Sequence, residues 1–97
     1  MPTVVHCKLE QYTHYIGRPS KLGNKYSRSG ESVYGVIKVD TVAEAIRRFE
    51  EDTRKNKYLM DLIKALPEDA VLGCWCKPGP CHGDSIVKIW NELHGKA

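Results

Sequence analysis

The segment from residue 70 to residue 94 constrains the fold most, because it changes from a strand pattern to a helical pattern within a few residues. Residues 70–76 are apolar and rich in branched side chains, which predicts a short buried strand. The prolines of Lys77-Pro78-Gly79-Pro80 end this strand. A helix is predicted over residues 81–94, with Gly95 at its C-terminal stop. Its apolar stripe consists of Ile86, Ile89, Trp90 and Leu93.

The rest of the chain predicts three more extended stretches and two more helices. The motif Thr41-Val42-Ala43-Glu44 matches a capping box, in which the Thr hydroxyl and the Glu carboxylate both accept hydrogen bonds from backbone amides. A helix should therefore begin at Thr41, and a second helix should end at Pro67. We expect strands over residues 3–9, 13–16 and 33–39, a long loop over residues 17–31, and the second helix over residues 57–66.

This order of elements is that of a small α/β domain. The 97 residues are enough for one domain, residues 1–97, and not for two. We predict a small sheet with about three helices. The final strand–loop–helix unit resembles half of a doubly wound fold, in which ligands bind beyond the carboxyl ends of the strands.

The charge of the chain is concentrated near its start. The net charge is +3, yet residues 1–30 alone carry five basic residues against one acidic residue, a net charge of +4. This excess suits a phosphate-bearing partner such as a nucleotide or nucleic acid, and a solubilising surface is the alternative. Because the sequence shows no membrane-spanning run and no secretory signal, we expect a cytoplasmic location.

The segment Cys74-Trp75-Cys76-Lys77-Pro78-Gly79-Pro80-Cys81-His82-Gly83-Asp84 permits three interpretations. In the first, Cys81 is a nucleophile or His82 a general acid or base, and Asp84 orients the imidazole. Cys81 lies at a predicted helix N-terminus, where the pKa of a thiol is lowered. Side chains at adjacent helical positions point apart, so His6 or His14 would have to serve as the base of Cys81.

The second interpretation of the same segment is a zinc site. Cys74, Cys76, Cys81 and His82 are ligand types that zinc prefers, although their spacing is not a standard one. In the third interpretation the cysteines are small buried side chains and the turn is structural. The sequence leaves these three alternatives open.

A second polar segment, Gly17-Arg18-Pro19-Ser20-Lys21-Leu22-Gly23-Asn24, follows the second predicted strand. The two glycines permit a close approach of the backbone to a ligand. The segment is neither a Walker A loop nor a dinucleotide-binding glycine motif. The candidate ligand-binding side chains here are Arg18, Ser20, Lys21 and Asn24, with Cys76 from the other segment.

Together these segments resemble a phage and microbial family, the domain of unknown function numbered 4326. The resemblance is carried by Ile-Gly-Arg-Pro-Ser…Leu-Gly-Asn, by a Thr-x-x-Glu-Ala-Ile helix and by Cys-Trp-Cys-x-Pro-x-x-Cys-His-Gly-Asp, over about residues 12–94. This chain has Gly23-Asn24-Lys25-Tyr26 where the family pattern leads us to expect Gly-Asn-Pro-Phe, so the loop is expected to be looser. The resemblance implies a phage or prokaryotic origin and a site built from both segments, and it supplies no reaction.

We therefore predict that residues 18–24 and 76–84 meet at one end of the sheet. The leading hypothesis is a pocket for a nucleotide, a nucleobase or a nucleic-acid phosphate, with group transfer or hydrolysis as the chemistry if the protein is an enzyme. The alternative is a non-catalytic module that binds a host protein, with structural or zinc-bound cysteines. For a phage protein the cytoplasm in question is that of the host.

Overall fold

The central element of the fold is a three-stranded parallel sheet. The computed structural model describes residues 1–18, 20–27, 36–77 and 79–96. Strand β5 (Val71–Cys74) lies between β1 (Thr3–His6) and β2 (His14–Tyr15), in the order β1-β5-β2. Thr3 pairs with Val71 at one end of the sheet, and His6 pairs with Cys74 at the other. On the other side of β5, Tyr15 pairs with Gly73, so all three strands end together near Cys74.

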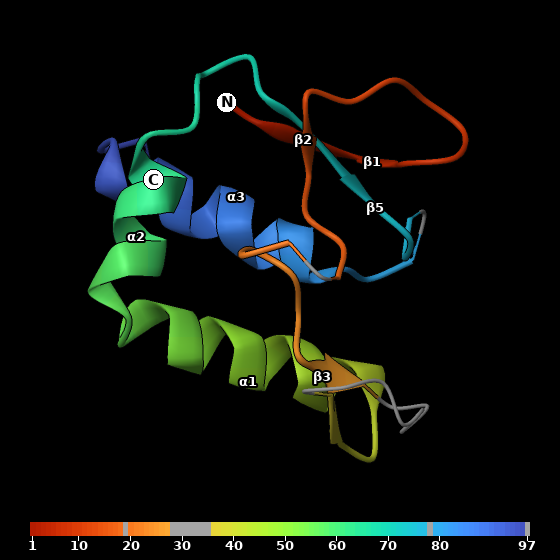
Figure 1. The fold of residues 1–97 in the computed structure, drawn as a ribbon. Helices are drawn as coiled ribbons and strands as arrows, with labels where there is room; N and C mark the ends of the chain where they lie inside the picture. The colour runs from red at the N-terminus through yellow and green to blue at the C-terminus, as the bar shows by residue number, and fades with distance from the viewer. Residues whose placement is uncertain (19, 28–35, 78, 97) are drawn as a thin grey trace.

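Helix α3 (His82–Leu93) packs on this sheet, and the other two helices pack on α3 and on each other. Helix α3 runs beneath the sheet, and α1 (Val42–Arg54) packs against the far side of α3 (Figure 1). Helix α2 (Lys57–Lys64) connects the two by contacting both. The predicted small α/β fold with about three helices is confirmed. Within the described residues, no helix has both the length and the apolar character needed to cross a membrane.

The expected strands are shorter in the structure, and one strand was missed. The missed strand is β3 (Tyr26–Ser27), which lies within the stretch expected to be a loop. It pairs in parallel with β4 (Ile37–Lys38) and lies beside α1. The strand expected over residues 33–39 is therefore reduced to β4, and residues 33–35 lie outside the described residues. A two-residue strand has too few side chains to show an alternating pattern, so β3 has no signal in the sequence.

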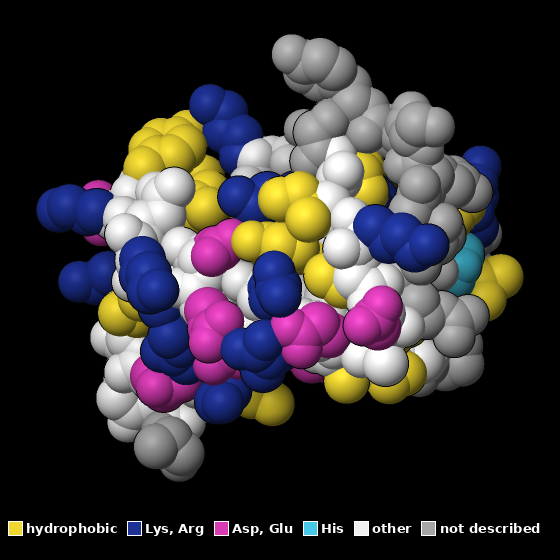
Figure 2. Space-filling view, turned by 90° about the horizontal axis from the view of Figure 1, so that it is seen from below, with side chains coloured by type: hydrophobic (Ala, Val, Ile, Leu, Met, Phe, Trp, Pro, Cys, Tyr) yellow, Lys and Arg dark blue, Asp and Glu magenta, His cyan; other side chains and the backbone are white. Residues whose placement is uncertain are grey.

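The helix boundaries follow the expected capping residues. Thr41 caps α1, with its Oγ1 accepting from the Glu44 amide at 3.0 Å. The Glu44 carboxylate, expected to complete a capping box, instead pairs with Arg47 and Arg48. Figure 2 shows such cationic and anionic side chains interleaved over the exposed face of α1, as charges four residues apart on a helix would be.

The core lies between β5, α3 and the two other helices. Leu72 and Cys74 of β5 are fully buried, as are Ile86 and Ile89 of the predicted apolar stripe of α3. Trp90 of the same stripe donates its indole N–H to the Leu66 carbonyl at 2.9 Å. Burying each of the large apolar side chains stabilises the fold by about 1.5–3 kcal/mol. The N-terminus of α3 is thereby fixed directly below the carboxyl end of β5.

Candidate functional site

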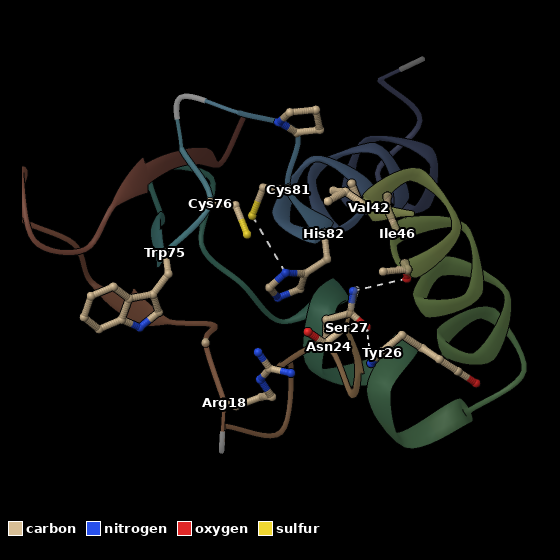
Figure 3. A pocket seen from close by; sticks show the side chains of 13 residues that line it. Arg18, Asn24, Tyr26, Ser27, Val42, Ile46, Trp75, Cys76, Cys81 and His82 are labelled. Carbon is tan, nitrogen blue, oxygen red and sulfur yellow. Dashed lines mark hydrogen bonds between the residues drawn. The ribbon is translucent and has the colours of Figure 1, made fainter. Parts of the chain in front are cut away.

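A pocket of about 160 Å³ lies where the two polar segments meet. Gly17, Arg18 and Asn24 line it from the first segment, and residues 75–76 and 80–82 line it from the second. Figure 3 shows the side chains of Arg18, Cys76, Cys81 and His82 converging from these two segments. The prediction that both segments meet at one end of the sheet is confirmed. The volume is below the ~300–1,000 Å³ of clefts that enclose drug-sized ligands, so the pocket suits a small molecule or one group of a larger one.

His82 joins the two segments directly. Its Nε2 atom lies 2.8 Å from the Ile16 carbonyl oxygen and 3.1 Å from the Leu22 carbonyl oxygen. Because a carbonyl can only accept, Nε2 carries the hydrogen and donates to both. Burial lowers the pKa of His82 below its ordinary value, and the imidazole packs edge-on against Phe49 at 4.8 Å. The residue is therefore a neutral imidazole at pH 7, with Nδ1 left as an acceptor.

Cys81 meets that acceptor although it is adjacent to His82 in sequence. Cys81 is the N-cap of α3 and has extended backbone angles (φ −143°, ψ 147°). The expectation that the two side chains point apart applies to consecutive helical positions and is therefore wrong here. The Cys81 Sγ atom lies 3.7 Å from Nδ1 of His82 and accepts from the Gly83 amide at 3.3 Å. Neither His6 nor His14 lines this pocket.

Three sulfur atoms gather beside the imidazole. The Sγ atoms of Cys74 and Cys81 are 2.8 Å apart, and both residues are fully buried. Cys76 comes after the end of β5 and is exposed, with its sulfur facing that of Cys81 (Figure 3). A hydrogen bond from Cys81 lowers the pKa of Cys76, and the charge of Arg18 acts in the same direction. The same hydrogen bond, together with burial, raises the pKa of the Cys81 thiol.

The four residues predicted as possible zinc ligands do not fit that ion. Two sulfur atoms on one tetrahedral zinc lie about 3.8 Å apart, since each Zn–S bond is about 2.3 Å long. The sulfurs of Cys74 and Cys81 are much closer than this. Within the described residues, no group of three or more His, Cys, Asp or Glu side chains is arranged to hold a metal ion. Cys74, Cys76 and Cys81 are therefore free thiols.

Asp84 caps a helix instead of orienting the imidazole. Its Oδ2 accepts from the Cys81 amide at 3.2 Å, which completes a capping box at the N-terminus of α3. Its Oδ1 pairs with the Lys77 ammonium at 2.8 Å. Both imidazole nitrogens of His82 face other groups, so the predicted role of Asp84 as the orienting group is corrected to a structural one.

The candidate ligand-binding residues of the first segment separate into two groups. Arg18 lines the pocket, and no described carboxylate pairs with it. Asn24 also lines the pocket, but it accepts from the Tyr26 amide and donates to the Ala45 carbonyl, so it ties this segment to α1. Ser20 and Lys21 do not line the pocket. Successive turns direct Lys21 to the Tyr58 hydroxyl of α2, at 2.9 Å.

Several lining residues were not predicted from the sequence. Helix α1 contributes the apolar side chains of Val42, Ala45 and Ile46. Tyr26 and Trp75 supply aromatic walls. Trp75 is 54 % exposed, and its indole N–H donates to the Tyr15 hydroxyl at 2.7 Å. The exposed tryptophan between two cysteines was the signal that could have identified it.

Fold and site together define a small α/β domain with a thiol–imidazole pocket at the carboxyl end of a parallel strand. The family model described as Domain of unknown function (DUF4326) matches residues 5–92, so the chain belongs to this family. The resemblance inferred from the sequence is thereby confirmed.

A phage protein is among the relatives of this chain. The chain is 42 % identical over 52 residues to a protein described as an uncharacterized 12.4 kDa protein in the nrdA–td intergenic region of Enterobacteria phage T4. The match covers 50 % of this chain and 48 % of the phage protein, so the chain spans about half the length of this curated relative. No solved structure matches the chain significantly.

Proposed function

We propose that the pocket binds a small anionic ligand that carries a flat ring, of the nucleotide or nucleobase class. The observation that supports this most is the meeting of a cation that pairs with no described carboxylate, Arg18, with aromatic and apolar walls in one cavity. A guanidinium is suited to a phosphate because its planar fork donates two parallel hydrogen bonds. The apolar walls suit the ring that such a ligand also carries.

Trp75 is the side chain best placed to stack on that ring. Its orientation is fixed by the hydrogen bond to Tyr15 and by an edge-on contact with the His6 ring, with centroids 5.8 Å apart. A base that stacks on an aromatic side chain gains about 1–3 kcal/mol. Because the indole is already held in place, little of this gain is lost in ordering it.

The four free cysteines support the cytoplasmic location that we propose for this protein. Thiols remain reduced in the cytoplasm, whereas an oxidising compartment favours disulfides. A nucleotide-type ligand is also available there.

The proposal is tested by titrating the full chain with nucleoside monophosphates while following tryptophan fluorescence. Trp90 is buried and Trp75 exposed, so a saturable change is expected to come from Trp75 and to vanish in Trp75→Phe. Removing the guanidinium in Arg18→Gln should weaken binding about 10- to 100-fold, the effect of losing a charge-assisted hydrogen bond of about 1.5–3 kcal/mol.

The matched control is Lys57→Gln, which removes the same charge from an exposed position on α2 outside the pocket. It should leave the affinity unchanged. A chain that shows no saturation with any monophosphate at millimolar concentration, or an Arg18→Gln variant with the affinity of the parent, would refute the proposal.

A second candidate function, docking on a host protein, is favoured by exposed apolar side chains beside the sheet. Leu9 and Tyr12 of the segment between β1 and β2 are both exposed, as is Trp75. If this function is the right one, Leu9→Ser should abolish the binding of a purified partner and leave nucleotide binding unaffected.

A further inference from the structure

We propose that Cys76 is the nucleophile of this pocket and that its sulfur attacks an electrophilic carbon of an anionic ligand held by Arg18. This inference rests on the proposed function, since it uses the same anion site. In the step, the S–C bond forms as the bond from that carbon to the leaving group breaks. The bonding electron pair departs with the leaving group, so neither an oxidant nor a reductant is required.

Cys76 is the one cysteine of the segment from Cys74 to Asp84 that is both exposed and part of the pocket wall. Cys74 and Cys81 are fully buried, so an incoming carbon atom cannot reach their sulfurs without movement of the fold. Cys76 follows the end of β5, where the chain leaves the sheet for the turn toward α3. Its position at the carboxyl end of the central strand is where α/β folds place reacting groups.

The neighbours of Cys76 favour its anionic form. Cys81 carries one thiol hydrogen and faces three acceptors, which are the Cys74 sulfur at 2.8 Å, the Nδ1 atom of His82 and the Cys76 sulfur. The contact with Nδ1 is long, at 3.7 Å, and a thiolate is the stronger acceptor because it is charged. When Cys76 is ionised, Cys81 therefore donates to it in place of the neutral Cys74 sulfur and acts as a positioning residue; this hydrogen bond, together with burial, keeps the Cys81 thiol protonated.

Arg18 connects the thiolate to the ligand. In Figure 3 its guanidinium lies on one side of the His82 ring, and the sulfurs of Cys76 and Cys81 lie on the other. The guanidinium lowers the pKa of Cys76 through its charge without pairing with a described carboxylate. An anionic ligand bound by Arg18 is thus placed in the same cavity as the reactive sulfur, which raises its effective concentration there.

The test is the alkylation of the native chain by iodoacetate and by iodoacetamide, with the modified cysteines mapped by mass spectrometry. Both reagents undergo the proposed step, with iodide as the leaving group, and only iodoacetate is anionic. Cys7, a half-buried thiol outside the pocket, is the internal reference. Cys76 should react first with both reagents, and its rate relative to Cys7 should be higher with iodoacetate.

Arg18→Gln tests the anion site at an exposed position that does not endanger folding. It should reduce the iodoacetate preference of Cys76 by about fivefold, the size expected for an interaction between exposed charges. Cys81→Ala should slow the reaction of Cys76 with both reagents alike, while circular dichroism checks that this variant is folded.

The inference would be overturned if Cys7 or Cys81 were alkylated before Cys76. It would also be overturned if Cys76 kept its preference for iodoacetate in Arg18→Gln. Slow alkylation of all four thiols together with stoichiometric zinc would also overturn it. If Cys76 reacts first with the expected preference but no nucleoside monophosphate slows it, the nucleophile stands and the nucleotide proposal fails. If a monophosphate binds at Arg18 but Cys76 is unreactive, the nucleotide proposal stands and the nucleophile is refuted.

Discussion

Helices α1 and α3 begin in the same way, yet only one of these beginnings builds a site. Each has an N-cap residue in extended backbone whose side chain accepts from an amide of the first turn, Thr41 in α1 and Cys81 in α3. Each has an acidic residue three positions later. Thr41 is exposed to solvent, whereas Cys81 is fully buried beneath the end of β5.

The two helix starts differ because the side chains of their first turns have different partners. At α1, the Glu44 carboxylate is free to pair with arginines of its own helix. At α3, His82 donates to the backbone of another segment, and Asp84 closes the capping box. A common helix start thus becomes a pocket when a strand end and a second loop close over it. The equivalent positions of the two helices therefore provide matched variants.

The largest difference in the stability effect of a substitution is expected at the first helical position, which is His82 in α3 and Val42 in α1. His82→Phe keeps a flat ring but leaves the buried Ile16 and Leu22 carbonyl oxygens without a donor. Since each unsatisfied buried group costs about 1–3 kcal/mol, the free energy of unfolding should fall by about 3 kcal/mol. Urea denaturation of Val42→Ala, an exposed position, provides the comparison and should show a small change. If both variants lost the same free energy of unfolding, the hydrogen bonds of His82 would not be what holds the two segments together.

The second helical position should give the next largest effect. A Cβ atom at Gly83 would lie 2.8 Å from Cδ1 of Ile16 and 2.9 Å from Cγ1 of Val4, so either these side chains or α3 would have to shift. Gly83→Ala is expected to destabilise the fold by about 1–3 kcal/mol, the usual range for overpacking. The converse change in α1, Ala43→Gly, affects an exposed position and should cost about 0.5–1 kcal/mol through backbone entropy. Thermal denaturation of both variants measures the difference, and a stable Gly83→Ala chain would show that α3 packs less closely than described.

A pH-dependent loss of stability should accompany the buried imidazole. Burial lowers the folded-state pKa of His82 below the unfolded value of about 6.5, so the unfolded chain binds the additional proton. The stability from His82 is complete above pH 6.5 and is lost as the pH falls toward the folded-state pKa. The slope from this residue approaches about 1.4 kcal/mol per pH unit at most. Denaturation curves from pH 7.5 to 5 should show this loss in the parent chain and less of it in His82→Gln; parallel curves would contradict a neutral buried His82.

The smallest difference is expected three positions after the cap. Asp84→Ala removes the acceptor of the Cys81 amide and the partner of Lys77, at a cost of about 1 kcal/mol. Glu44→Ala removes exposed ion pairs of α1, which contribute little, so it should be nearly neutral. Both variants are measured in the same denaturant series. A larger loss of unfolding free energy in Glu44→Ala than in Asp84→Ala would contradict this order.

The sequence predicted the parts of the fold that depend on local chemistry. Thr41 as a helix cap, Pro67 beyond a helix end and the apolar stripe of α3 all follow from short-range rules, and the structure confirms them except for Leu93, which lies in the last turn of α3 and is 36 % exposed. Strand β3 could not be predicted in this way, because its two residues are defined by pairing with residues eleven positions later. The convergence of the two polar segments was predictable because parallel strands end at a common edge.

The roles within the site were less predictable than its location. Whether Asp84 orients an imidazole or caps a helix depends on which donor lies nearest, and the residue type permits both. The contact between Cys81 and His82 depends on the helix beginning one residue later than expected, which turns Cys81 from a helical residue into a cap. The hydrogen bonds from His82 to the Ile16 and Leu22 carbonyls join positions more than 50 residues apart and have no local signature.

The central claim is that a neutral His82 holds the two segments together through Nε2 and faces Cys81 with Nδ1. Long-range ¹H–¹⁵N correlation spectra of the imidazole ring test this directly, because protonated and unprotonated ring nitrogens have well-separated chemical shifts. At pH 7 we expect a neutral His82 ring with the hydrogen on Nε2 and none on Nδ1. An imidazolium, or a ring protonated on Nδ1, would contradict it, because neither could combine the two carbonyl contacts with an acceptor facing the thiol.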